Sequence, residues 1–358
     1  MQTSDQLALQ RMLERAAEYQ ASDLHLTVGS PPILRIDTKL APLTDFPVLT
    51  KDFLGGLVDV FLDDNQKKSF DAEREISFSY AFLKNSRFRV NLFYQRGVIS
   101  ASLRYIGGRI PTLHDLHLPE SVESLVSHTR GLIIVDGPLG SGRSTTIAAL
   151  VQQINLTRQE YMLTIEQPVE YLFVNNKSII EQREVGRDTP SISHALQSAA
   201  QEDVNVIMIS NMDDPEVLRL ALSLASSGRL VIGSLNVDTT AKAIEQVITA
   251  FPGTEQRRAR IELSETLLGV ICQRLVPRVG GGRIIVAEVL IANSAVRSVV
   301  REGNFSPLTN IIQTSREEGM VALDSALAQL IKTGEVRLED ALVFAEDRNT
   351  LAQITQAY

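Results

Sequence analysis

The segment Gly137-Pro138-Leu139-Gly140-Ser141-Gly142-Arg143-Ser144-Thr145-Thr146 decides the fold of this 358-residue chain. Its spacing matches the phosphate-binding loop G-x-x-x-x-G-K-[ST], except that arginine replaces the lysine. Glycines at three positions let the backbone turn sharply and bring its N–H groups close to an anion. We therefore expect the following residues to bind a nucleotide: Gly137, Pro138, Leu139, Gly140, Ser141, Gly142, Arg143, Ser144 and Thr145.

The sequence on either side of the loop predicts a strand–loop–helix unit. Leu132 to Val135 is short, apolar and β-branched, which is typical of a buried parallel strand. Ser144 to Ile154 predicts a helix, whose N-terminus would direct its positive dipole end at the phosphates. The Ser144 hydroxyl is the expected Mg²⁺ ligand. The alternative, an ordinary glycine-rich turn, is disfavoured by this context.

Length and composition indicate about two soluble globular domains. Apolar residues make up 44% of the chain and charged residues 22%, as in ordinary globular proteins. The net charge of −8 disfavours a nucleic-acid partner. No run of 18 uncharged apolar residues predicts a transmembrane segment, and Met1 to Gln20 lacks the apolar core of a signal peptide.

The single cysteine indicates the compartment. Cys272 lies in the apolar stretch Leu267 to Leu275, which we expect to be helical, and its thiol is expected to be buried. One cysteine excludes an internal disulfide and a cysteine zinc site, and it favours the cytoplasm.

The chain is expected to contain an α+β domain over residues 1–106, a linker over 107–112 and a second domain over 113–358. The first domain is predicted to contain helices over 5–19 and 51–73 and strands over 23–28, 33–36, 88–94 and 98–105. Gly107, Gly108 and Pro111 mark the linker.

From about residue 112 strands and helices alternate, which predicts a mainly parallel sheet with helices on both faces. The expected strands cover 132–136, 161–165, 204–210, 229–235 and 283–290, and the expected helices cover 144–156, 190–202, 214–227 and 239–250. Thr189-Pro190 and Asp214-Pro215 are expected helix starts. After residue 290 the chain is expected to be helical. The fold class is therefore α/β.

Motifs along nearly the whole chain resemble the PilT and PilU retraction ATPases of the type IV pilus, within the wider secretion-ATPase superfamily. Besides the loop, the resemblance rests on the following segments: Ala21-Ser22-Asp23-Leu24-His25-Leu26-Thr27-Val28-Gly29, Arg87-Phe88-Arg89-Val90-Asn91, Thr164-Ile165-Glu166-Gln167-Pro168-Val169-Glu170, Gln182-Arg183-Glu184-Val185-Gly186, Gly269-Val270-Ile271-Cys272-Gln273-Arg274-Leu275 and Ala295-Val296-Arg297-Ser298-Val299-Val300-Arg301-Glu302-Gly303.

The resemblance implies a PAS-like N-terminal domain and a RecA-like P-loop ATPase domain with a helical C-terminal tail. It also implies ATP and Mg²⁺ as ligands, a homo-oligomer of six subunits or a mixed assembly with an active PilT-like paralogue, and an inner-membrane pilus platform protein as partner. The expected location is the cytoplasm or the periphery of the inner membrane. Arg87, Arg89 and Arg104 match basic positions that in relatives reach toward nucleotide phosphates on domain closure. A solvated strand face is the alternative.

The sequence departs from the family pattern at its chemistry. Arg143 is wider and geometrically more demanding than the family's lysine, although it keeps the charge. Asn211 stands where the second nucleotide motif, Walker B, carries glutamate, so the carboxylate that helps to hold Mg²⁺ is missing. Two family histidines are replaced by Arg229 and Asn236.

Two family arginines are also replaced, by Gln197 and Gln201. His194 has no family role and is expected at the surface. Glu166 keeps its acidic position, and we expect it either to act as the general base for the attacking water or to tether a strand end.

Three functional hypotheses remain open. The chain is a degenerate retraction ATPase with weak or lost hydrolysis and a regulatory or accessory role. Alternatively, it is an active motor with altered residues, in which Glu166 activates water and Glu170 or Asp203 assists the metal. The third is a scaffold that needs no nucleotide.

Overall fold

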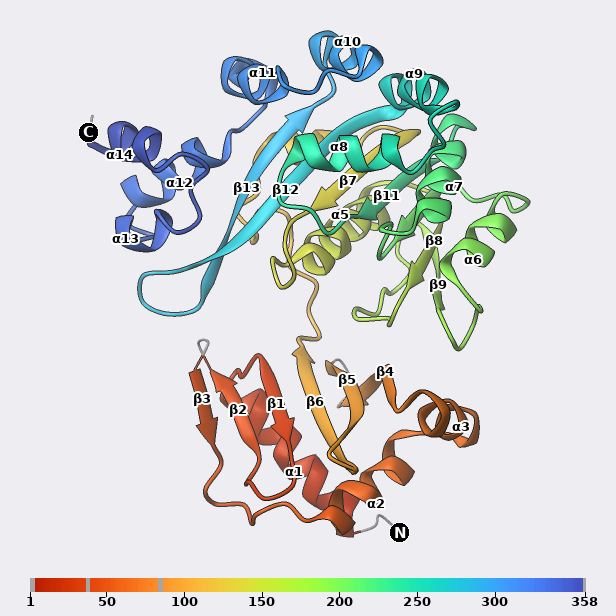
Figure 1. Cartoon of the computed structure of the whole chain (residues 1–358), viewed down its shortest axis with the longest axis vertical. Coiled ribbons are helices and arrows are strands. Elements are labelled where there is room, and N and C mark those ends of the chain that lie inside the picture. The colour runs from red at the N-terminus through yellow and green to blue at the C-terminus, as the bar shows by residue number, and fades with distance from the viewer. Residues whose placement is uncertain (1–3, 37–38, 83–85, 357–358) are drawn as a thin grey trace. The chain divides into compact units, whose positions relative to one another are not determined.

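The computed structural model describes residues 4–36, 39–82 and 86–356, which form two compact units (Figure 1). The first unit comprises the described residues up to Arg109 together with the short segment Pro168–Leu172. The second unit comprises Ile110–Gln167 and the described residues from Phe173 onward.

The first unit is a six-stranded antiparallel sheet with helices packed on it, in the strand order β3-β2-β1-β6-β5-β4. Its strands are β1 (Asp23–Leu26), β2 (Ile33–Ile36), β3 (Lys39–Pro42), β4 (Glu75–Phe82), β5 (Ser86–Gln95) and β6 (Val98–Ile106). Its helices are α1 (Ser4–Glu18), α2 (Lys51–Phe61) and α3 (Asp64–Glu73).

Alternation along β5 builds the core of this unit. Phe88, Val90 and Leu92 are fully buried because every second side chain of a strand points to the same face. The opposite face of β5 carries Arg87 and Arg89. The α+β character of this unit, expected from the sequence, is confirmed.

The second unit is a seven-stranded sheet in the order β13-β12-β7-β11-β10-β8-β9, parallel throughout except for β13. Its strands are β7 (Gly131–Asp136), β8 (Tyr161–Glu166), β9 (Ile179–Glu184), β10 (Val206–Ile209), β11 (Leu230–Ser234), β12 (Leu267–Pro277) and β13 (Arg283–Ile291).

Helices cover both faces of this sheet, as the sequence predicted. They are α4 (Glu120–Leu125), α5 (Arg143–Thr157), α6 (Ile192–Ala199), α7 (Pro215–Ser226), α8 (Thr240–Thr249), α9 (Gln256–Thr266), α10 (Ser294–Glu302) and α11 (Leu308–Thr314). Leu132 and Ile134 of β7 face a core shared with α6 to α11, whereas Ile133 and Val135 face a core shared with α4 and α5.

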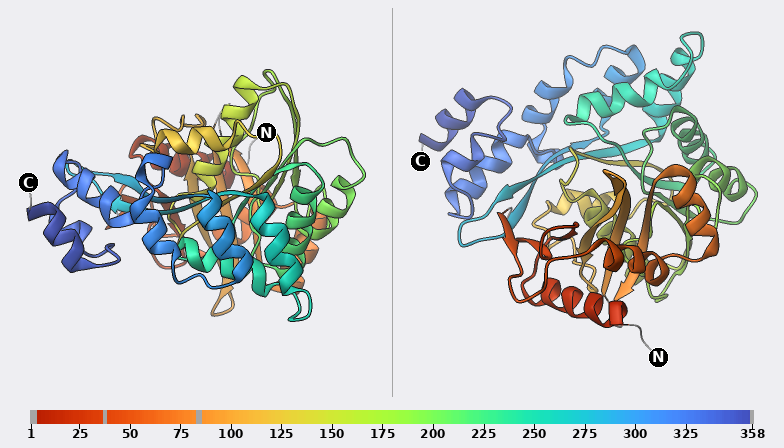
Figure 2. Two further views of the ribbon diagram at one scale, coloured as in Figure 1. Left: turned by 90° about the horizontal axis from the view of Figure 1, so that it is seen from above. Right: turned by 60° about the horizontal axis from the view of Figure 1, so that its bottom comes forward.

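The chain ends in the expected helical tail: a short 3₁₀ turn (Arg316–Glu318), α12 (Leu323–Lys332), α13 (Leu338–Ala341) and α14 (Arg348–Gln356). These helices pack on the outer ends of β12 and β13 through Val276, Ile284 and Val286, and they are drawn in blue in Figures 1 and 2. None of the helices in the described ranges combines the length and apolar character needed to cross a membrane.

The helix expected over Leu267–Leu275 is wrong, because this stretch forms β12. Val270 faces one core and Ile271 faces the other. A strand covered on both faces is apolar at successive positions, so the alternation that identifies a half-exposed strand is lost. Cys272 lies in this strand and is buried, as expected.

The expected start of the sixth helix is also wrong by two residues. Ser191, not Thr189, caps α6, because its hydroxyl accepts the His194 N–H at 3.1 Å. Asp214 does cap α7 as predicted, with Pro215 in the first turn. Strands β3, β4 and β9 were not expected.

Candidate nucleotide-binding site

The loop between β7 and α5 adopts a backbone conformation that demands glycine. Gly137, Gly140 and Gly142 have φ values of +139°, +81° and +91°. A Cβ atom at Gly137 would lie 2.3 Å from the Gln273 carbonyl oxygen and 2.6 Å from the Ser141 hydroxyl. The close approach and the left-handed conformations exclude side chains here, which agrees with a backbone shaped to wrap an anion.

A buried glutamine from the neighbouring strand holds this loop. The Gln273 side chain is fully buried in β12, and its Nε2 donates a hydrogen bond of 2.7 Å to the Ser141 carbonyl. Because β12 pairs directly with β7, this amide fixes the loop relative to the sheet from which it emerges.

The helix that follows leaves donors for an anion. The N–H groups of Thr145 and Thr146 turn back to the Gly142 carbonyl at 3.1 Å, so the N–H groups of Arg143 and Ser144 are among those without an intrahelical acceptor. The N-cap residue Gly142 has no side chain to occupy them. Leu139 is 85% exposed at the rim of the loop. The residues present therefore fit a phosphate group.

The Arg143 side chain is directed across the sheet edge. Its Nη1 donates a hydrogen bond to the Leu235 carbonyl, just after β11. Burial lowers the pKa of Arg143, whereas the nearby Asp213 and, to a smaller extent, Asp136 act to raise it. The guanidinium thus lies half-buried between the loop and the turns that follow β10 and β11.

Asn211 lies in the turn after β10, where its side chain is exposed. Its Oδ1 accepts the Asp213 N–H at 2.8 Å, so it is engaged within its own turn. The Asp213 carboxylate in turn accepts the Asn236 N–H at 3.0 Å. Parallel strands end at one edge of the sheet, and this places Asn211, Asp213 and Asn236 near the loop after β7.

Glu166 ends β8 at the same edge and is 5% exposed. One carboxylate oxygen accepts hydrogen bonds from the Thr164 hydroxyl at 2.7 Å and from Gln182 Nε2 at 2.8 Å. Thr164 lies on β8 and Gln182 on β9, so this contact ties the two strands together.

A buried carboxylate lies directly behind the loop. Asp136 ends β7 and is fully buried. Burial raises its pKa to about 8, the neighbouring Cys272 thiol opposes the rise, and the nearby Glu288 adds to it. In the strand register Asp136 lies opposite Cys272, and Cys272 lies opposite Glu288. Burial also raises the pKa of Glu288, whose carboxylate accepts the Thr240 hydroxyl at 2.7 Å.

The arginines singled out from the sequence, Arg87, Arg89 and Arg104, share one face of the first unit's sheet, and each has a partner within that unit. Arg87 donates to the Ser79 hydroxyl at 2.7 Å, and Arg104 to Asp23 at 3.0 Å. Arg89 lies 3.3 Å from Glu170. Glu170 therefore already has a cationic partner, which disfavours it as the acid that assists the metal.

The remaining substituted residues of the family motifs lie away from the loop. Arg229 lies at the amino end of β11, where it donates to the carbonyls of Ala200 and Glu202 at 3.2 Å. It therefore binds the end of α6, at the strand end opposite to Leu235. Gln197 donates to Glu216 at 3.3 Å on the surface. His194 is exposed, as predicted, and so are Gln201 and Asp203.

No cluster of three or more histidine, cysteine or acidic residues suited to a metal occurs within residues 4–36, 39–82 and 86–356. The exposed Ser144 hydroxyl fits the weak, largely hydrated coordination that Mg²⁺ adopts beside phosphates. The phosphate oxygens of the nucleotide would have to supply most of the negative charge that binds Mg²⁺ here.

Three residues of this site were not assigned from the sequence. Asp213 follows Asn211 by two positions, Asp136 is the last residue before the loop, and Gln273 was recognised only as part of a motif. An acidic residue ending a buried apolar strand was the available signal for Asp136, whereas the contacts of Asp213 and Gln273 join segments far apart in the chain.

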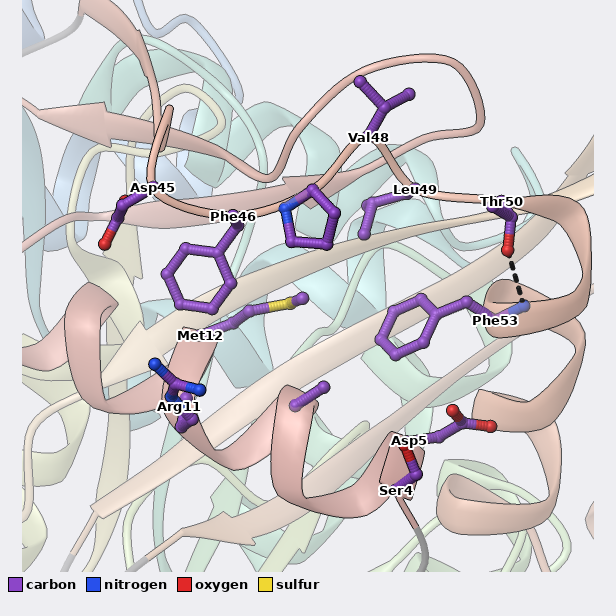
Figure 3. A pocket seen from close by; sticks show the side chains of 12 residues that line it. Ser4, Asp5, Arg11, Met12, Asp45, Phe46, Val48, Leu49, Thr50 and Phe53 are labelled. Carbon is purple, nitrogen blue, oxygen red and sulfur yellow. Dashed lines mark hydrogen bonds between the residues drawn. The ribbon is translucent and has the colours of Figure 1, made fainter.

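A separate pocket of about 410 Å³ lies in the first unit between α1, α2 and the turn before α2 (Figure 3). Phe46, Phe53 and Met12 supply much of its wall. Its polar groups serve the fold, since Thr50 accepts the Phe53 N–H at 3.2 Å and the Arg11 guanidinium lies over the Phe46 ring at 5.9 Å. We therefore place the candidate chemistry at the loop instead.

Comparison with known proteins identifies the family of this chain. Residues 112–281 match the family model described as type II/IV secretion system protein. The chain is 38% identical to the type IV pilus retraction ATPase PilT of Pseudomonas aeruginosa over 92% of this chain and 96% of that protein. This chain belongs to the PilT and PilU family of type IV pilus ATPases.

Two further comparisons extend the match across the fold. The chain is 33% identical to the type IV pilus ATPase PilU of Pseudomonas aeruginosa, over 96% of this chain and 90% of that protein. A crystal structure of the pilus retraction motor PilT with bound ADP superposes with a TM-score of 0.86 at 39% identity, covering 96% of this chain and 99% of that one. The resemblance inferred from the sequence motifs is therefore confirmed.

Replacing Asp136 by asparagine should make the protein more stable at high pH. The folded state retains the Asp136 proton up to about pH 8, whereas the unfolded chain loses it near the ordinary value of 3.8. Over this pH range the unfolded chain releases a proton that the folded state keeps, so the free energy of unfolding of the wild type falls as pH rises. We expect the advantage of Asp136→Asn in free energy of unfolding to grow by up to about 4 kcal/mol between pH 5 and pH 8.

Urea unfolding at several pH values measures this difference, and Asp203→Asn on the surface is the matched control. The control should differ from the wild type by a small and constant amount. An Asp136→Asn advantage that is independent of pH would show that Asp136 is ionised in the folded protein.

Replacing Gln273 by leucine should loosen the loop. The Ser141 carbonyl would lose its buried donor, which typically costs about 1–3 kcal/mol. We expect lower thermal stability and weaker binding of fluorescent ADP, measured by anisotropy. The exposed Gln353→Leu variant should change neither. Unchanged ADP binding in Gln273→Leu would mean that the clamp does not shape the phosphate site.

Proposed function

We propose that this chain is a nucleotide-binding subunit of the type IV pilus retraction machinery, that its ATP hydrolysis is weak or lost, and that it regulates or assists an active motor. One observation carries the proposal. The loop keeps its glycines, its Gln273 clamp and its free helix N-terminus, while the charged side chains expected to act on the phosphates are changed.

Arg143 supports this proposal through its shape and its contact. A lysine ammonium is a compact point charge, whereas a guanidinium is planar and requires a fixed hydrogen-bond geometry. The Arg143 guanidinium binds the Leu235 carbonyl rather than pointing freely out of the loop. Catalysis of phosphoryl transfer depends on charges already placed at the transition state, so a cation held elsewhere lowers turnover.

Asn211 supports the proposal through its charge. An amide oxygen brings no negative charge to Mg²⁺, and the Asn211 oxygen already accepts the Asp213 N–H. Mg²⁺ would supply charge neutralisation at the phosphates when bound. Ser144 is the residue that we propose to hold it.

Glu166 is the proposed general base if any turnover remains. Its carboxylate already accepts two hydrogen bonds through one oxygen, which reduces its freedom to orient and deprotonate a water molecule. We propose that this restraint adds to the loss of charge at Arg143 and Asn211.

The family relationship supports the remaining parts of the proposal. We propose that the chain assembles as a ring of six or as a mixed ring with an active PilT-like paralogue, and that it docks on the inner-membrane pilus platform protein from the cytoplasmic side. We also propose that nucleotide binding causes a domain closure that brings three basic side chains toward the phosphates: Arg87, Arg89 and Arg104. ATP held without turnover would then keep the assembly in one conformational state.

The direct test compares ATP binding and hydrolysis by the wild type and by the double variant Arg143→Lys, Asn211→Glu. We expect wild-type protein to bind ATP but to hydrolyse it roughly 10²-fold more slowly than PilT of Pseudomonas aeruginosa, since one misplaced electrostatic group costs about that much. The double variant should recover part of the rate, and adding Glu166→Gln should abolish the recovery.

Two other outcomes would contradict the proposal in different ways. Wild-type hydrolysis at the rate of PilT would identify an active motor with altered residues. Absence of any ATP-dependent rise in melting temperature would indicate a scaffold that does not bind nucleotide, because a ligand that binds only the folded state must stabilise it.

A further inference from the structure

Hydrogen bonds connect the turn after β10 to the turn after β11, beside the phosphate-binding loop. The Asp213 N–H donates to Asn211 Oδ1 at 2.8 Å, and Asp213 Oδ1 accepts the Asn236 N–H at 3.0 Å. The carboxylate of Asp213 is therefore fixed in place by a backbone donor from the next turn. Leu235, whose carbonyl binds Arg143, directly precedes Asn236.

Asp213 and its neighbour Asp214 have different roles. Asp214 caps α7, since its carboxylate accepts the N–H groups of Glu216 at 2.7 Å and Val217 at 3.3 Å. The helix start therefore does not need the Asp213 side chain. Asp213 instead acts electrostatically on the Arg143 guanidinium, as does Asp136 from inside the sheet.

We propose that Asp213 is a positioning residue that draws Arg143 onto the Leu235 carbonyl and so withdraws the cation of the loop from the phosphate site. This inference rests on the proposed nucleotide binding and states how that binding is weakened. Phosphate oxygens prefer the paired donors of a guanidinium. They must compete with Asp213 for Arg143, so the nucleotide-free loop is held in a resting state by a residue of its own chain.

Of the two acidic residues near Arg143, Asp213 is the one whose charge acts on the guanidinium. Asp136 is fully buried and its raised pKa of about 8 keeps it largely neutral at pH 7, so its pull on the guanidinium is small. Asp213 is only partly buried and lies in a turn. Its substitution by asparagine retains an oxygen for the Asn236 N–H and removes only the charge.

The experiment is a double-mutant cycle between Arg143 and Asp213, read out by the Kd of fluorescent ADP with Mg²⁺. We expect Asp213→Asn to tighten binding up to about fivefold, as for a partly exposed charge pair. In an Arg143→Ala background the same substitution should change the Kd less than twofold. Asp213→Glu should match the wild type, because it keeps the charge.

Asp214→Asn is the matched control, since it removes an adjacent charge that has a capping role. Asparagine caps a helix about as well as aspartate, so this variant should change the stability of the protein little and leave the Kd close to that of the wild type. Equal tightening by Asp213→Asn with and without Arg143 would overturn the proposal, because simple repulsion between Asp213 and the phosphates would then explain it. Weaker binding in Asp213→Asn would also overturn it and would indicate a metal-binding carboxylate.

A second readout uses no nucleotide and separates this inference from the proposed function. The four proteins of the cycle are the wild type, Arg143→Ala, Asp213→Asn and the double variant. When they are unfolded in urea without ligand, the changes in free energy of unfolding should be non-additive if Arg143 and Asp213 interact. If none of them binds ADP but this coupling is present, the proposed function fails and the electrostatic coupling between Arg143 and Asp213 stands. Additive changes would overturn this coupling whatever the result for ADP.

Discussion

The structure of the site depends on a backbone constraint: a tight loop of left-handed glycines that is pinned to the sheet by the Gln273 amide. The positive φ values of Gly137, Gly140 and Gly142 disfavour any other residue, and Gly137 also leaves no room for a Cβ atom. The hydrogen bond to the Ser141 carbonyl fixes the loop to β12. Because this shape is made from backbone and a neutral amide, it persists when charged residues change. The loop can therefore stay an anion-binding feature after its catalytic groups are altered.

The charged groups around this loop form a different pattern from the one implied by the family motif. Arg143 contacts the turn after β11, Asn211 binds within its own turn, and Asp213 supplies a negative charge near the guanidinium. Arg229, by contrast, supports the end of α6 at the far end of its strand. The substitutions thus divide into those that change the electrostatics of the site and those that maintain the fold, a division that the sequence motifs alone do not show.

Much of the fold could be predicted because its signals are local. The loop, the strand before it and the helix after it follow from glycine spacing and apolar runs, and the α/β alternation predicts the parallel sheet. The helix predicted over Leu267–Leu275 was wrong because a strand between two cores has no apolar–polar alternation. The direction of Arg143 and the contact between Asp213 and Asn236 could not be predicted, since they join residues that meet only after β7, β10 and β11 have paired.

We propose that this protein binds nucleotide at the loop it shares with the retraction motors but hydrolyses it slowly. Single-turnover phosphate release tests it most directly, with ATP and Mg²⁺ prebound to an excess of wild-type protein. The account predicts that ATP stays bound and that inorganic phosphate appears only slowly. Prompt phosphate release, at the rate measured for PilT under the same conditions, would contradict it.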